Sequence, residues 1–107
     1  GILGAVAVPK YFDLTEDAKD KAINAAGAEL QARINQSFAE QLLSTSGACT
    51  TAIDNIDTGA IQDDLGDFSI VGGLDAISSG DTSQPITILD TKNNYSRDFT
   101  LRIPTCN

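Results

Sequence analysis

A chain of 107 residues, of which 41% are apolar, has room for one modest core and therefore for one domain. Its formal net charge of −8, from 15 acidic and 7 basic residues, disfavours phosphate-bearing partners, so neither nucleic acid nor an anionic lipid surface is expected as a ligand. Histidine is absent, which excludes Ser-His-Asp and Cys-His catalysis and removes the commonest metal ligand. We therefore expect no enzyme, no catalytic residues, no metal and no cofactor.

The first eight residues, Gly-Ile-Leu-Gly-Ala-Val-Ala-Val, form an uncharged run that ends at Pro9. This run is too short to span a bilayer. It also lacks the basic flank and the cleavage pattern of a complete signal peptide. We interpret residues 1–14 as the remnant of a longer apolar helix that is cut at Gly1.

Helical periodicity extends over residues 15–47. Apolar residues recur at steps of three and four and form one stripe, which consists of Ile23, Ala26, Leu30, Ile34, Phe38 and Leu42. Glu29 and Arg33 are spaced for an i,i+4 ion pair, and Gly47 is suited to end the helix in a left-handed conformation. A second arc of small side chains either packs against another backbone or reflects the high helix propensity of alanine. That arc consists of Ala25, Ala28, Ala32 and Ala39.

Residues 48–67 are rich in Thr, Asp, Asn and Gly, which predicts an irregular connection with one short helical turn. Strand patterns follow at residues 68–73, 86–90 and 99–103, and residues 92–95 form a turn before the last of them. In that last strand Phe99, Leu101 and Ile103 alternate with polar residues, as in a sheet with one face on a helix and one in water. The expected fold is α+β, a long N-terminal helix packed on a small antiparallel sheet formed by residues 68–107.

The two cysteines, Cys49 and Cys106, lie far apart in the sequence. A disulfide between them would close a loop that the chain-entropy model values at about 4 kcal/mol of stability. Two buried free thiols in a cytosolic protein are the alternative, and the cysteine pattern alone leaves both open.

The segment Gly1-Ile-Leu-Gly-Ala-Val-Ala-Val-Pro-Lys-Tyr resembles the conserved N-terminal region of type IV pilins and of the related type II secretion pseudopilins. Pro9 falls at the helix-kinking proline of that family, and Tyr11 follows where an aromatic residue is common. The leading Phe, the assembly-guiding Glu and the first half of the membrane-embedded helix of the family are absent from this sequence. The resemblance implies a long helix, a variable loop, a small antiparallel sheet and a C-terminal disulfide, here Cys49–Cys106.

The resemblance also implies a structural subunit that polymerises into a pilus filament through its N-terminal helix. Ile2, Leu3, Val6 and Val8 would then form the filament interface, with the helix kink at Pro9. The implied partners are further copies of the chain, the pilus or secretion assembly machinery and, before assembly, the inner membrane through the missing N-terminal segment. The implied location is an extracellular filament, reached from the inner membrane and periplasm.

Two other functions remain open. A pseudopilin of a type II secretion system would share the N-terminal pattern, although major pseudopilins more often carry a calcium-bound loop than a C-terminal disulfide. The stretch 54–59 resembles a calcium loop but has Ile56 in place of the third-position ligand and no Glu at the twelfth position. A secreted, non-enzymatic binding module would leave the apolar start unexplained.

Overall fold

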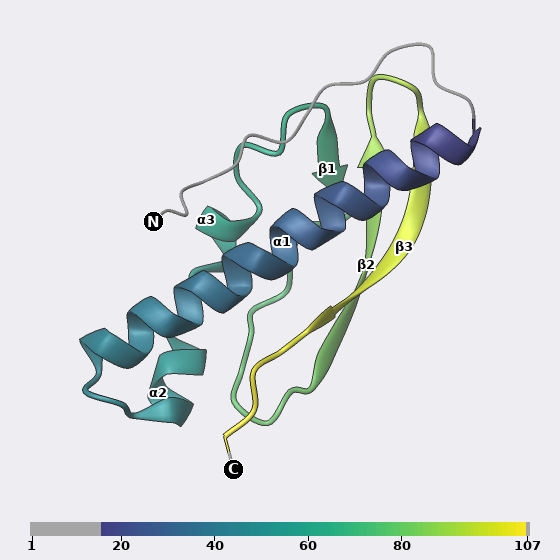
Figure 1. Ribbon diagram of the computed structural model, residues 1–107. Helices are drawn as coiled ribbons and strands as arrows, with labels where there is room; N and C mark the ends of the chain where they lie inside the picture. Colours follow the sequence, from purple (N-terminus) through teal and green to yellow (C-terminus); the bar gives the residue numbers. More distant parts are fainter. Residues whose placement is uncertain (1–15, 107) are drawn as a thin grey trace.

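A computed structural model of the chain describes residues 16–106. Its elements, in chain order, are α1 (Glu16–Ser44), α2 (Cys49–Asp54), α3 (Thr58–Ile61), β1 (Phe68–Ile70), β2 (Ser83–Asp90) and β3 (Tyr95–Arg102). The three strands form one antiparallel sheet in the order β1-β2-β3, and α1 lies across it (Figure 1). The predicted α+β class, with a long helix and a small antiparallel sheet, is therefore confirmed.

Two residues with positive φ follow the end of the helix α1, Ser46 at 57° and Gly47 at 87°. The Ser46 N–H donates to the Leu43 carbonyl at 3.3 Å, and the Gly47 N–H donates to the Leu42 carbonyl at 2.7 Å. This pair of bonds is the Schellman pattern, in which the first left-handed residue directly follows the last helical turn. The left-handed cap expected at Gly47 therefore begins one residue earlier, on Ser46.

The connection between α1 and the sheet contains two short helices, α2 and α3, where the sequence predicted one helical turn. Buried isoleucines anchor this segment, with Ile53 fully buried and Ile56 only 6% exposed. The carboxylate of Asp57 caps α3 by accepting the Ala60 N–H at 3.3 Å, and that of Asp54 accepts the Ser79 N–H at 2.8 Å. These carboxylates of the calcium-like stretch thus bond backbone amides.

The hairpin between β2 and β3 is organised by Asp90, which is only 1% exposed. Its carboxylate accepts the backbone N–H groups of Lys92 and Asn93 at 3.0 and 3.1 Å and the Asn93 side-chain amide at 2.8 Å. Asn94 takes a positive φ of 52°, as expected for an asparagine in a tight turn. Both strands of this hairpin begin earlier than the sequence patterns indicated, at Ser83 and Tyr95.

The core lies between α1 and the facing side of the sheet. From the predicted stripe, Ile23, Leu30 and Ile34 are fully buried, whereas Phe38 is only partly buried. From β3 and the residue after it, Leu101 and Ile103 are buried against the same cluster. Burial of such side chains contributes about 1.5–3 kcal/mol each.

The disulfide Cys49–Cys106 is present, with its Cα atoms 5.9 Å apart, and the predicted pairing is confirmed. It joins the first residue of α2 to the segment that follows β3. The bridge therefore fixes the C-terminal segment to the helical side of the fold.

Candidate assembly surface on the long helix

One side of α1 faces away from the sheet and carries no charge. Every exposed position between residues 22 and 39 holds alanine, asparagine or glutamine. We call this surface the outward side of α1, and it consists of Asn24, Ala25, Ala28, Ala32, Asn35, Gln36 and Ala39. It includes all four alanines of the second arc, so these small side chains do not contribute to the core of the described domain.

This lack of charge contrasts with the rest of the molecule. The chain carries a net charge of −8, and an exposed helix face is ordinarily rich in charged residues. Charged residues border the outward side at both ends, at Lys21 and Glu40. Beyond Glu40, Leu43 is 84% exposed and extends the uncharged surface toward the end of α1. Small side chains also let another backbone approach closely, so the composition suits packing against a second helix.

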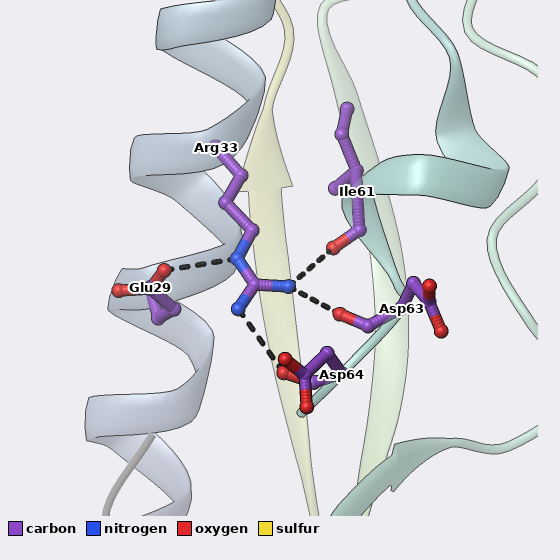
Figure 2. A network of polar contacts seen from close by, with 5 residues as sticks. All are labelled: Glu29, Arg33, Ile61, Asp63 and Asp64. Carbon is purple, nitrogen blue, oxygen red and sulfur yellow. Dashed lines mark hydrogen bonds and ion pairs between the residues drawn. The ribbon is translucent and has the colours of Figure 1, made fainter. Parts of the chain in front are cut away.

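Arg33 fastens one flank of α1 to the loop between α3 and β1 (Figure 2). Its Nε lies 2.9 Å from the Glu29 carboxylate, which is the i,i+4 pair expected from the sequence. One terminal nitrogen donates to the carbonyls of Ile61 at 3.0 Å and Asp63 at 2.5 Å, and the other donates to that of Asp64 at 3.2 Å. Both side chains of the pair are largely buried, so the guanidinium is held by three carbonyls and one carboxylate at once.

The opposite flank of α1 is held by β3, beginning at Tyr95. The Tyr95 hydroxyl donates to the Asp20 carboxylate at 2.7 Å, and Arg97 pairs with the same carboxylate at 2.9 Å. Arg97 also lies 4.2 Å from the centre of the Tyr95 ring. Desolvation, and then the hydrogen bond to Asp20, raise the pKa of the Tyr95 hydroxyl above its ordinary value.

Two further contacts continue this flank toward the C-terminal end of β3. The Phe99 ring lies directly against Gly27, where a methyl group added to the glycine would overlap the ring. The Gln31 amide accepts the Arg102 N–H at 2.7 Å and donates to the Arg102 carbonyl at 2.9 Å. Contacts on both flanks therefore fix the rotation of α1 and keep its uncharged side turned away from the domain.

The predicted interface residues Ile2, Leu3, Val6 and Val8, and the predicted kink at Pro9, lie outside the described residues. Of the predicted site residues, the structure brings together Cys49 and Cys106. The sequence patterns did not predict the contact of Gly27 with Phe99 or the hydrogen bonds of Gln31 with Arg102. They also did not predict the hydrogen bonds from Arg33 to backbone carbonyls. Each of these contacts joins residues that are distant in the chain, and no local spacing signals them.

Within residues 16–106, no three His, Cys, Asp or Glu side chains gather in a way that could hold a metal ion. None of the helices in that range is long and apolar enough to cross a membrane. Comparisons of the chain with family models, with curated proteins and with solved structures find no match.

Proposed function

We propose that this chain is a non-enzymatic structural subunit of a type IV pilus filament, which polymerises through its N-terminal helical region. The observation that carries the proposal is the uncharged outward side of α1. In the sequence, the uncharged apolar run at residues 1–8 precedes this helix. A filament would bury the apolar run and the outward side of α1 together.

Burial between copies of the chain favours side chains without charge. Burying a charged group between subunits requires a partner for it, whereas alanine side chains can be buried at little desolvation cost. Asparagine and glutamine on the same side can exchange hydrogen bonds with a neighbouring subunit. A heterologous contact that does not close on itself then extends into a helical fibre.

The sheet is compatible with the same assignment, because its face away from α1 is mostly polar, with Val71 and Pro85 as exposed apolar residues. Pro85, Asp98, Thr100 and Arg102 are exposed on it, and Thr87 donates to the Asp98 carboxylate at 2.9 Å. Such a face suits the water-exposed exterior of a filament. The Cys49–Cys106 disulfide fits an oxidising compartment, as expected of a protein that passes through the periplasm to the cell surface.

The test is to place one charge on the outward side of α1 in cells that assemble the full-length protein. Ala28→Asp should abolish filaments in electron micrographs, because an unpaired carboxylate would be buried between helices. Thr51→Asp, on the exposed surface of α2, is the matched control and should leave filaments normal. Normal filaments from a folded Ala28→Asp protein would overturn the proposal. If the protein is instead a secretion pseudopilin, the same change would stop protein export from cells that make no surface pili from this subunit.

A further inference from the structure

The strand β3 forms one edge of the sheet, and alternate residues of an edge strand direct their backbone N–H and C=O groups outward. One hydrogen bond shows which residues of β3 bond β2 and which face outward. The Ile103 N–H donates to the Thr82 carbonyl at 3.0 Å, in register with the pairing of Ser83 and Arg102. Odd-numbered residues of β3 therefore bond β2. Ser96, Asp98, Thr100 and Arg102 direct their backbone groups away from it.

Side chains occupy both ends of this edge. The Gln31 amide takes both backbone groups of Arg102, as a neighbouring strand would. Near the other end, Arg97 donates to the Ser96 carbonyl at 2.9 Å. Between them, the backbone N–H and C=O groups of Asp98 and Thr100 have no hydrogen-bond partner within the described residues. The edge is thus open at Asp98 and Thr100, occupied on both backbone groups at Arg102 and occupied on the carbonyl at Ser96.

We propose that this edge pairs with the same edge of a second copy of the chain. The two β3 strands would run antiparallel and in a register centred on Thr100. The two sheets would then join into one continuous sheet across an isologous, two-fold interface. This pairing uses β3 and does not depend on the filament contact of α1.

The charges along β3 select the second copy as the partner. In the register centred on Thr100, each Asp98 lies directly opposite the Arg102 of the second copy, on the same polar face of the sheet. Opposite charges at directly facing positions stabilise a strand pair, and the two central threonines add a favourable cross-strand contact. A register centred on Asp98 would instead oppose two carboxylates. The other sheet edge, β1, has only three residues and offers a much shorter ladder.

Gln31 competes with this pairing, because the Arg102 backbone must leave the Gln31 amide to bond the second copy. The groove beside this contact is lined by Phe38, Ile103 and Pro104, so the released amide has space next to α1. Gln31 is therefore expected to weaken the association of two copies.

The first experiment exchanges the two charges and measures the dimer Kd by sedimentation equilibrium of residues 1–107 at about 0.15 M salt. At that ionic strength the Debye length is about 8 Å, which screens the repulsion between two chains of net charge −8. Asp98→Arg and Arg102→Asp should each raise the Kd about tenfold, since each places like charges opposite one another twice. The double variant restores opposite charges and should return the Kd to within about twofold of the original.

The second experiment removes the competing amide. Gln31→Ala should lower the dimer Kd, although it removes two hydrogen bonds within the chain. If Gln31 only stabilised the fold, its removal would not lower the Kd, so the direction of the change in Kd distinguishes the two roles. Gln36→Ala, the same change at an exposed position of the same helix, should leave the Kd unchanged. Ala28→Asp should also leave it unchanged, which distinguishes failure of this inference from failure of the filament proposal. A chain that stays monomeric up to about 1 mM, or a double variant as weak as the single ones, would overturn the pairing.

Discussion

The inward and outward sides of α1 belong to the same helix but differ in their burial and in what explains their composition. The inward side places Ile23, Leu30 and Ile34 in a fully buried core, and the fold accounts for each of them. The outward side, represented by Ala28 and Ala32, touches water in the subunit, and the fold alone would tolerate charged residues there. Burial within the described domain therefore accounts for the inward residues but not for the lack of charge on the outward side. We propose that burial against further copies of the chain accounts for that lack of charge.

The strongest test of the inward side is Leu30→Ala. Leu30 is fully buried, so its truncation should cost about 2–5 kcal/mol and lower the Tm by at least about 8 °C. Leu43→Ala, on a residue that is 84% exposed, is the matched control and should change stability by less than about 0.5 kcal/mol. Phe38→Ala should fall between them, because Phe38 is only partly buried. Equal melting temperatures for the Leu30 and Leu43 variants would contradict the assignment of sides.

The next largest loss of stability is expected from the contacts of Arg33, which orient α1. Arg33→Gln should cost about 2–3 kcal/mol, because it leaves the largely buried Glu29 carboxylate unpaired and three carbonyls without their donor. Lys21→Gln breaks the exposed Lys21–Asp17 pair, whose atoms are 3.6 Å apart, and should cost less than about 0.5 kcal/mol. Urea titrations of both variants provide the measurement. A similar small effect of both changes would mean that the Arg33 network does not hold the loop.

A smaller effect is expected where α1 approaches β3. Gly27→Ala gains up to about 1 kcal/mol of helix propensity, but the new methyl group would overlap the Phe99 ring. We expect a net destabilisation of about 1–2 kcal/mol in thermal unfolding, because overpacking outweighs the gain. Combining Gly27→Ala with Phe99→Leu should recover part of this loss. A stabilised Gly27→Ala variant would show that the ring shifts freely and that the close approach is not required.

The smallest effect on the subunit is expected on the outward side. Ala28→Asp should change the free energy of unfolding by less than about 1 kcal/mol, which reflects only the lower helix propensity of aspartate. Circular dichroism and urea denaturation of the isolated chain provide the check. A larger loss would place Ala28 in the core and remove the distinction between the two sides.

The fold class could be predicted from the sequence because it depends on local periodicity. Ile23, Leu30 and Ile34 repeat at helical spacing, and Leu101 and Ile103 alternate as in a strand. The short helices α2 and α3 could not be predicted, because their Thr- and Asp-rich sequences are equally typical of loops. Only their buried isoleucines distinguish these segments from loops. Of the candidate assembly surface, the sequence identified the alanine arc but not its exposure. That exposure depends on the contacts of Arg33 and Gln31 with backbone groups far along the chain.

The most direct test of the account is whether the outward side of α1 becomes buried on assembly. Ala32→Cys and Thr51→Cys variants of the full-length protein would be treated with a thiol reagent, both as free subunits and as assembled filaments. Both positions are exposed in the subunit, so both variants should react fully in the free state. We predict that assembly protects the Ala32→Cys variant strongly and leaves the Thr51→Cys variant reactive. Equal labelling of both variants in filaments would contradict the claim that this side of α1 packs between subunits.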